Sequence, residues 1–539
     1  MMLQNTRFTL RWRSGTYATY ETYSSGGGGI VYGGGTGAIQ ILGCSILDQT
    51  GQTYYLIQDI LNATTSQCIN ITANNVTLDC QGHTIDGNDS ATYGVYVYRT
   101  TPTTSNATIK NCTVSDWNTA NIYFRYANGN TLENITSLSS PSWGIWLNSS
   151  NSNNFTTVTA NSNGSDGIFI QGSNNNLTSV IANSNTFDGI EVRGNSNTLT
   201  NITANSNSSG NGVLLYIGSA SNVLSNINAS SNRSGVNFTQ SSGNTLQDST
   251  LTNNSRYDID LYAGVDNECN NTVSNVTGTG NKPILYLNTA STFSGRNNID
   301  SEIILCNADN SNLSNIILDH TGLTQNNALI LARTDNATFN NITLKNLQSG
   351  LIVTMGSSGN SFTSVTSTVN DDHGIEVSAP SNTFTNVTAN NNDFYGVLLW
   401  GNSNIFDGLT ANSNDEGVVL IGSLNTIKNS HIESNTPYGI RLSDGGSSGS
   451  NTIYNNVFRN NTNFYFSETI YANNWNVAST TGPNIIGGSY IGGNYWTNPS
   501  GTGYSDTCTD SNSDGFCDNP YVLPTPGGPN QADNLPLKP

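Results

Sequence analysis

The chain has few charged residues and no long apolar run. Only 10% of its 539 residues are Asp, Glu, Lys or Arg, and 17 basic residues stand against 36 acidic ones. A nucleic-acid binder needs a basic surface to neutralise phosphates. The longest apolar runs, such as residues 396–400 and 328–332, are far shorter than the roughly 20 residues that span a bilayer. We therefore expect no nucleic-acid partner and no membrane span.

Helical periodicity is also missing, and a different repeat takes its place. An Asn followed two positions later by an apolar residue recurs at steps of 21 to 26 residues, namely at Asn130, Asn153, Asn175, Asn197, Asn222 and Asn244, and again at Asn360, Asn382, Asn404, Asn425 and Asn451. Such a repeat in a polar chain is typical of a solenoid, because one unit is too small to bury its own apolar face.

Within each repeat, short segments such as Gly-Ile-Phe-Ile at 167–170 and Gly-Ile-Glu-Val at 189–192 alternate with period 2. This alternation predicts strands with one buried face. Asn, Ser, Gly and Asp lie between the strands and favour bends. The sequence therefore predicts an all-β, single-stranded parallel β-helix of about 22 residues per coil, with roughly 17 or 18 coils between residues 69 and 475.

We expect four segments along the chain. Residues 1–43 form a Gly-rich N-terminal arm, 44–95 the N-terminal cap and first coils, 96–475 the β-helix repeats, and 476–539 a C-terminal cap with an Asp-rich loop. The given sequence shows no apolar segment typical of a signal peptide near its start.

The repeated Asn has two interpretations. Stacked side-chain amides would bond to one another and to the corner backbone, as aligned identical residues do. Alternatively, the 24 Asn-x-Ser/Thr sequons, a number close to chance for this composition, would carry N-glycans. The glycosylation candidates are Asn70, Asn75, Asn111, Asn201, Asn275, Asn341 and Asn386.

Eight cysteines are spread through the chain without the spacing of a zinc site. We expect disulfides in an oxidising compartment, with Cys508 and Cys517 as the best local pair and further links among the N-terminal four. The alternative is free buried thiols in a reducing cell. The remaining disulfide candidates are Cys44, Cys68, Cys80, Cys112, Cys269 and Cys306.

The C-terminal segment contains the motif of a cation-binding loop. Asp510, Asn512, Asp514 and Asp518 place oxygen ligands at alternating positions around Gly515. This arrangement begins like a calcium loop, although Tyr521 stands where an EF-hand has its bidentate Glu. The sequence therefore predicts a Ca²⁺ site closed by Asp518, with a plain Asp/Asn turn as the alternative.

Several motifs together resemble one family. They are the segment Leu-Asp-Cys-Gln-Gly-His-Thr-Ile at 78–85, the repeated Gly-Ile-x-Leu/Val units, and a C-terminal series with Asn-Tyr-Trp at 494–496 and Asn-Pro-Tyr at 519–521. From about residue 44 to 539 the chain resembles the NosD-like β-helix proteins with carbohydrate-binding and sugar-hydrolase (CASH, PbH1) repeats. The resemblance implies a right-handed parallel β-helix and a secreted or surface-exposed protein, as in many archaeal members.

Three functions compete within that fold. A copper role would need soft or imidazole ligands, and three Met and four scattered His argue against it. A polysaccharide hydrolase or lyase acting on an acidic glycan would need paired carboxylates. The only suggestive cluster is Asp371, Asp372 and His373, near Glu376 and Glu416, and a solvated bend explains it equally well.

The remaining function is that of a non-catalytic extracellular or cell-surface rod, either structural and adhesive or carbohydrate-binding. Glycans or further copies of the chain would be its partners. Aromatic residues could stack on sugar rings, although core packing explains some of them too: Trp143, Trp146, Tyr395 and Trp400. The Gly-rich arm could add as a strand to a neighbouring copy and build a surface layer or filament.

Overall fold

A computed structural model describes residues 39–100, 105–354, 356–443, 449–467, 471–525 and 531–539, together with the backbone of three short strands nearer the N-terminus. The chain divides into two compact units. Unit 1 ends near residue 277 and unit 2 begins near residue 278, with short pieces of 255–277 exchanged between them. Most of the predicted Gly-rich arm lies outside the described residues.

Each coil consists of three straight segments separated by bends. In a representative coil, Phe155 and Val158 lie on the two halves of one long strand and Ile168 on the next strand, and all three are at most 1% exposed. The residues between them point outward because side chains alternate along a strand. The predicted alternation therefore builds the interior of the solenoid.

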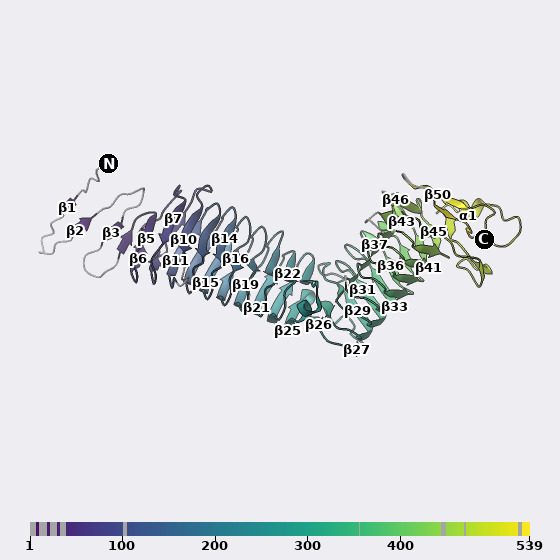
Figure 1. Cartoon of the computed structure of the whole chain (residues 1–539), viewed down its shortest axis with the longest axis horizontal. Coiled ribbons are helices and arrows are strands. Elements are labelled where there is room, and N and C mark those ends of the chain that lie inside the picture. The colour runs from purple at the N-terminus through teal and green to yellow at the C-terminus, as the bar shows by residue number, and fades with distance from the viewer. Residues whose placement is uncertain are drawn as a thin grey trace. The chain divides into compact units, whose positions relative to one another are not determined.

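Two parallel sheets form the wall of unit 1 (Figure 1). Sheet I contains β5 (Ser45–Leu47), β7 (Gln67–Ile71), β10 (Tyr93–Tyr98), β12 (Ala120–Arg125), β14 (Trp143–Asn148), β16 (Ile168–Gln171), β18 (Ile190–Val192), β20 (Asn211–Leu215), β22 (Ser234–Thr239) and β24 (Tyr257–Tyr262). Sheet II contains β4 (Ile39–Ile41), β6 (Thr53–Leu56), β8 (Thr77–Asp79), β9 (Thr84–Asp86), β11 (Thr108–Ser115), β13 (Thr131–Leu138), β15 (Asn154–Asn161), β17 (Asn176–Ile181), β19 (Thr198–Thr203), β21 (Val223–Ser230), β23 (Thr245–Thr252) and β25 (Thr272–Gly278).

Unit 2 is built in the same way. Sheet III contains β26 (Lys282–Leu287), β28 (Glu302–Cys306), β30 (Leu329–Ala332), β32 (Leu351–Val353), β34 (Ile375–Val377), β37 (Tyr395–Leu399), β40 (Glu416–Leu420), β43 (Tyr438–Ser443) and β46 (Phe464–Ser467). Sheet IV contains β27 (Thr292–Ser294), β29 (Asn312–Asp319), β31 (Thr338–Lys345), β33 (Ser361–Thr368), β35 (Thr383–Thr385), β36 (Thr388–Asn390), β38 (Ile405–Asp407), β39 (Thr410–Asn412), β41 (Thr426–Lys428), β42 (His431–Glu433), β44 (Thr452–Tyr454), β45 (Val457–Arg459) and β49 (Tyr495–Thr497).

The other elements lie at the ends and at the division of the chain. They are β1 (Arg7–Thr9), β2 (Thr19–Glu21), β3 (Ile30–Tyr32), β47 (Thr480–Thr481), β48 (Tyr490–Ile491), β50 (Tyr521–Leu523), β51 (Gln531–Asp533), helix α1 (Tyr504–Thr507), and two short 3₁₀ turns at Asp266–Cys269 and Thr279–Asn281. Among the described residues, no helix is long and apolar enough to cross a membrane.

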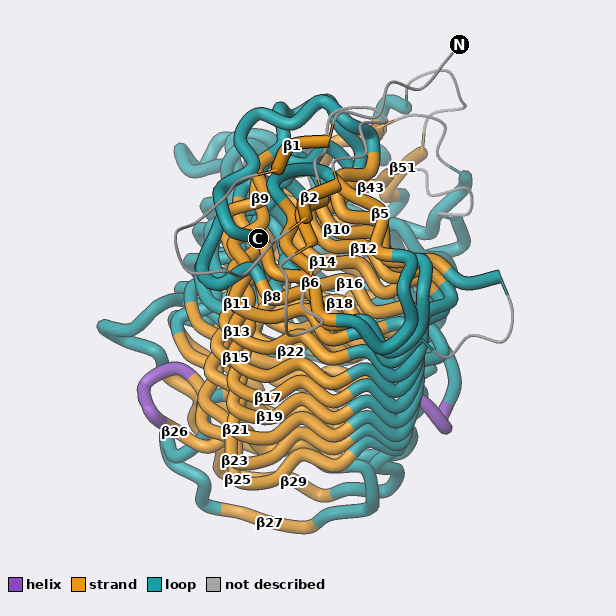
Figure 2. Tube along the Cα trace, turned by 90° about the vertical axis from the view of Figure 1, so that its left-hand side faces the viewer, coloured by secondary structure: helices purple, strands orange, loops and turns teal. Residues whose placement is uncertain are grey.

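The solenoid has about 18 turns of about 23 residues, close to the predicted 22. Paired positions in neighbouring coils are mostly 22 residues apart, and the separation rises to 25 between Asn197 and Asn222 and to 27 between Asn244 and Asn271. Residues inserted at these turns lengthen the coil without changing the strand register. Figure 2 shows the strands of successive coils stacked on one another. The average period therefore exceeds the basic one.

The recurring Asn forms a hydrogen-bonded ladder. The amide Nδ2 of Asn153 donates to Oδ1 of Asn175 at 2.8 Å, and Asn175 donates to Asn197 at 3.0 Å. Each Oδ1 also accepts the backbone N–H of the preceding ladder residue. These side chains are at most 1% exposed, so their polar groups need such partners. The stacking interpretation of the repeated Asn is confirmed.

All eight cysteines are paired. The disulfides join Cys44 to Cys68, Cys80 to Cys112, Cys269 to Cys306, and Cys508 to Cys517. The first two link neighbouring coils at the start of unit 1, and the last lies in the C-terminal cap. The predicted use of cysteine in disulfides is confirmed.

Candidate functional site

The outer face of sheet I carries a column of aromatic side chains. Because alternate residues of each strand point outward, Tyr96, Tyr123, Trp146 and Phe169 lie at paired positions of four consecutive coils. Their ring centroids are 5.5, 4.5 and 6.1 Å apart along the column, and the rings are close to parallel. We call this column the outer ladder.

Stacking leaves mainly the ring edges of the outer ladder in contact with solvent. Tyr96, Tyr123 and Phe169 are at most 8% exposed. The guanidinium of Arg193, one coil further, lies 4.9 Å from the centre of the Phe169 ring and 4.6 Å from that of Tyr216. The ladder therefore covers and stabilises the outer surface of the sheet, and a ligand ring would need an aromatic face elsewhere.

Such faces occur where the ladder ends, in a groove of about 330 Å³. It is lined by Trp143, Ser165, Asp166, Phe169, Gln171, Phe187, Asp188, Glu191 and Arg193. Phe187 lies in the bend before β18 and is 51% exposed. Trp143 is half-buried and starts β14. The groove thus has aromatic walls with acidic and basic groups between them.

Three carboxylates converge in this groove. Asp166, Asp188 and Glu191 each present an oxygen within 4.8 Å of the others, and all three side chains are buried. The indole Nε1 of Trp143 donates to Asp166 Oδ2 at 3.2 Å, and the backbone N–H of Asp188 donates to Asp166 Oδ1 at 3.0 Å. Arg193 forms an ion pair with Glu191. The carboxylates are therefore held in place by neighbouring coils.

Burial changes the protonation of two of them. Desolvation raises the pKa of Asp166 to about 7, and the negative charge of Asp188 adds to this effect. Desolvation also raises the pKa of Asp188 to about 6, against two hydrogen bonds from Asn211 that favour its ionised form. Near neutral pH the cluster therefore holds a proton that exposed aspartates would have lost.

In the described part of the chain, these residues are the one group of three acidic, His or Cys side chains close enough to share a metal ion. Their oxygens are suitable ligands for a hard cation. However, Arg193 already neutralises Glu191. The group is therefore described as a carboxylate cluster, and no metal is assigned to it.

The sequence-predicted cluster on unit 2 has a different geometry. His373 Nδ1 lies 3.2 Å from Asp372 Oδ1 without hydrogen-bond geometry, and its ring stacks on Tyr395 at 4.8 Å. Desolvation lowers the pKa of His373, which favours the neutral imidazole. Desolvation and the charges of Asp393 and Asp372 raise the pKa of Asp371.

The two glutamates predicted near this cluster have separate surroundings. Glu416 pairs with Arg441 at 2.7 Å, and burial raises the pKa of Glu376. An ion-paired carboxylate beside one arginine is common in structural networks. We therefore keep Asp371, Asp372 and His373 as a prediction and place the candidate site on unit 1.

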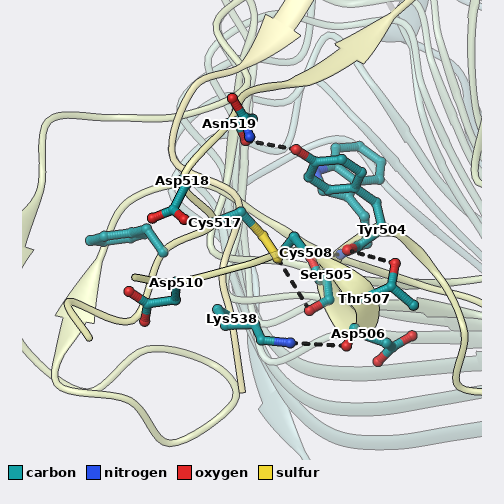
Figure 3. Close-up of a disulfide and its surroundings, with 12 residues drawn as sticks. Tyr504, Ser505, Asp506, Thr507, Cys508, Asp510, Cys517, Asp518, Asn519 and Lys538 are labelled. Atoms are coloured by element: carbon teal, nitrogen blue, oxygen red, sulfur yellow. Dashed lines mark hydrogen bonds between the residues drawn. A yellow bond between two sulfur atoms is a disulfide. The ribbon is translucent and has the colours of Figure 1, made fainter. Parts of the chain in front are cut away.

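The predicted calcium loop lies next to the Cys508–Cys517 disulfide (Figure 3). Asp510 accepts hydrogen bonds from the backbone N–H groups of Asp514 and Gly515, at 3.1 and 2.9 Å. Asp518 accepts from the backbone and hydroxyl of Ser511, at 2.9 and 2.7 Å. Asn512 donates to Asp514. The oxygens of Asp510 and Asp518 therefore bond to the loop's own backbone, as in an Asp/Asn turn, and the Ca²⁺ site stays a prediction.

The predicted glycosylation residues lie on the surface or partly on it. Asn75, Asn201, Asn275, Asn341 and Asn386 are exposed. Asn70 on β7 and Asn111 on β11 are half-buried. None of the seven belongs to the buried ladder.

Sequence reasoning identified Trp143 and Trp146 but missed the carboxylates beside them. Asp166 and Asp188 occupy the same repeat position, in Ser-Asp-Gly-Ile at 165–168 and Phe-Asp-Gly-Ile at 187–190. Their separation of 22 residues equals one coil, so stacking places them next to each other. Comparing equivalent positions of adjacent repeats would have found this pair.

The described residues do not fit a copper site. The cysteines are all in disulfides, and the three methionines lie outside the described residues. Both ring nitrogens of His320 lie within 3.2 Å of backbone oxygens. His83 and His431 each lie beside a carboxylate of their own. No soft or imidazole donor set comes together in the described part of the chain.

Two family models match the chain. One describes the right-handed beta helix region and matches residues 29–201 and 166–304. The other describes the periplasmic copper-binding protein NosD and matches residues 287–501. No curated protein sequence matches the chain.

Solved structures similar to this chain include two tailspike proteins and one epimerase module. The Dettilon tailspike protein is 13% identical over 61% of this chain and 59% of its own length, with a TM-score of 0.36. The mannuronan C-5 epimerase AlgE6 A-module of Azotobacter vinelandii is 12% identical over 78% and 89%, with a TM-score of 0.21. The tailspike protein of E. coli bacteriophage HK620, solved with a pentasaccharide, is 9% identical over 73% and 70%, with a TM-score of 0.25.

At such identities and scores the structural likeness supports no functional argument. The beta-helix model, in contrast, covers just over half of the chain, and the strand pattern agrees with it. The chain therefore belongs to the right-handed β-helix family, with a NosD-like region in its second unit.

Proposed function

We propose that the protein is a non-catalytic, secreted or cell-surface β-helix protein that binds a glycan in the groove on sheet I. The observation that carries this proposal is the pairing of aromatic walls with buried, converging polar groups in one groove. Sugar rings offer apolar faces for aromatic stacking and hydroxyls for hydrogen bonds. The four disulfides fit an oxidising compartment outside the cytosol.

Each wall has a defined task in this proposal. The exposed ring of Phe187 stacks on the apolar face of a sugar, and Trp143 borders the opposite side. Carboxylate oxygens of Asp166 and Glu191 accept hydrogen bonds from sugar hydroxyls, while Gln171 and Arg193 donate. Three carboxylates against one guanidinium favour a neutral glycan over an acidic one.

The test is calorimetric titration of the full chain with a panel of neutral and acidic oligosaccharides. Phe187→Ala is expected to weaken binding of a neutral oligosaccharide by roughly 5- to 30-fold, because one ring contact contributes about 1–2 kcal/mol. Trp400→Ala is the matched control, since Trp400 is equally exposed at 51% but lies on unit 2. Equal losses in both variants, or no binding by the parent chain, would refute the proposal.

A second candidate, glycoside hydrolysis, is favoured by one observation. Asp166 retains a proton near neutral pH, as a general acid must, beside a second carboxylate. Release of reducing ends from a bound oligosaccharide, abolished in Asp166→Asn with binding retained, would establish it. Binding without turnover would leave the non-catalytic function.

We also propose that the Asp510–Asp518 loop binds Ca²⁺. The motif and the disulfide that closes it support this assignment. A calorimetric titration with calcium, repeated on Asp514→Ala, tests it, and identical heats for the two proteins would exclude the site.

Electron microscopy with calcium and with a chelator would test self-assembly into a layer or filament. Isolated particles under both conditions would exclude it.

A further inference from the structure

One corner of each coil, away from the groove, places several sequons in the same conformation. The long strands of sheets II and IV bend at a residue whose φ is positive. Six such residues are the first Asn of an Asn-x-Thr sequon and have φ between 51° and 56°, namely Asn111, Asn134, Asn201, Asn275, Asn341 and Asn386. Asn tolerates this left-handed conformation better than most residues.

The coil also determines the other two sequon positions. After the corner, the chain returns to an extended conformation, so the next side chain points inward and the following one outward. In the coil of Asn201, Ile202 is 1% exposed and Thr203 is half-buried on the outside. Five of the six corner asparagines are exposed, and Asn111 is half-buried. The corner therefore presents the Asn and the Thr of the sequon on the outer surface, while the middle residue is buried.

The hydrogen bonds at the corner leave room for a covalent bond to the amide. Asn275 Nδ2 donates to Asp248 Oδ1, and Asn341 Nδ2 donates to Asn315 Oδ1, each at 2.7 Å. An amide nitrogen has two hydrogens. An N-glycan replaces one of them, so the remaining hydrogen keeps the bond to the neighbouring coil.

Other sequons lie in a second buried ladder, in which the amides of Asn163, Asn185, Asn207, Asn232 and Asn254 bond from coil to coil. Asn207 and Asn232 begin Asn-x-Ser sequons but are only 0% and 2% exposed. Asn232 Nδ2 donates both to Ala204 O at 2.9 Å and to Asn254 Oδ1 at 3.3 Å. A glycan attached at either position would displace hydrogen bonds of the ladder, and the interior of the coil would have no space for it.

We propose that the corner asparagines carry N-glycans and that the ladder asparagines do not. The glycans form a row along one edge of each unit. In unit 1 this edge lies between the two halves of the sheet II strands, whereas the groove is on sheet I. A glycosylated protein therefore keeps its groove open.

The experiment is site-resolved mass spectrometry of the folded full chain secreted from a cell that attaches N-glycans. Glycan release that converts each modified Asn to Asp marks the occupied sites. We expect occupancy at exposed corners such as Asn201 and Asn341 and none at Asn207 or Asn232. Unmodified corners, or ladder sites occupied as often as corners, would overturn the proposal.

Two variants separate accessibility from sequon strength. Thr203→Val keeps the shape of the outward side chain and the Asn201 corner, and should lower Asn201 occupancy at least tenfold. Ser209→Thr gives Asn207 the same third residue as the corner sequons, at an exposed position. Folded protein of this variant should still lack a glycan on Asn207. Occupancy there equal to that of the corners would contradict the role of burial.

Discussion

The two units place their aromatic ladders on opposite sides of the solenoid wall. In unit 1 the ladder of Tyr96, Tyr123, Trp146 and Phe169 lies outside sheet I. In unit 2 the stacked rings are inside, with Phe339, Phe362, Phe384 and Phe406 at centroid distances of 4.7, 4.7 and 4.3 Å. Both arrangements follow from stacking equivalent residues of successive coils.

This difference shows which of the two aromatic columns is required by core packing and which is not. The inner rings of unit 2 are at most 1% exposed and fill the core, where an apolar residue is required. The outer column of sheet III has no stacked rings in the described strands from β30 to β40. Ile330 pairs with Ile352, Glu376 follows, and Leu398 pairs with Val419. The core therefore does not demand rings on the outside, and the outer ladder of unit 1 with its groove is the more informative feature for function.

The largest effect should come from removing an inner ring. Phe384→Ala is expected to lower the free energy of unfolding of unit 2 by about 3–5 kcal/mol, because it leaves a cavity between two stacked rings. Trp146→Ala on the outer ladder should cost roughly half as much, since its ring edge already contacts water. Hydrogen exchange resolved by peptide assigns each loss to its unit. Equal losses in the free energy of unfolding would show that the inner and outer ladders stabilise their units to the same extent.

Replacing a ladder asparagine should lower the free energy of unfolding by the same amount in both units. Asn197→Ala removes the acceptor for the backbone and side-chain N–H of Asn175, and Asn382→Ala removes the acceptor for the backbone and side-chain N–H of Asn360. Each variant should lose about 2–3 kcal/mol, because a buried donor is left without a partner. Chemical unfolding of the two variants checks this. A loss confined to one unit would show that the ladders are not equivalent.

The pH dependence should distinguish the groove from the rest of unit 1. Asp166 and Asp188 have folded pKa values of about 7 and about 6, above the ordinary 3.8. Their contribution to stability is fully present below about pH 4 and is lost as pH rises to about 7, because the folded state binds more protons in that window.

The double variant Asp166→Asn, Asp188→Asn should therefore flatten the fall in the free energy of unfolding between pH 4.5 and 7.5. The expected difference is on the order of 2 kcal/mol after allowance for relaxation of the site. Urea unfolding at both pH values measures it in unit 1, and Asp415→Asn, at an exposed position on unit 2, is the control. An unchanged slope in the double variant would mean that these carboxyls titrate normally.

Much of the fold was predictable because the residues of a single repeat already indicate its strands and its length. The alternation in Gly-Ile-Phe-Ile indicates a strand, and the Asn spacing indicates the coil. The groove was harder to predict from the sequence, because Phe187, Asp188 and Glu191 look like ordinary bend and strand residues in isolation. Only their alignment with Trp143 and Asp166 from neighbouring coils makes them a site. The Asp371–Asp372–His373 motif could be found in the sequence for the opposite reason, since its residues are adjacent along the chain.

The amino-acid sequence by itself determined the period, the strand faces, the use of cysteine in disulfides and the stacking of Asn, because each of these depends on residues within one coil or on identical residues one coil apart. The tertiary structure decided which side of the wall an aromatic column occupies, which carboxylates share a groove and which sequons face water. These properties depend on what lies above and below each residue along the stack, and burial there sets both the pKa of a carboxyl and the accessibility of an amide.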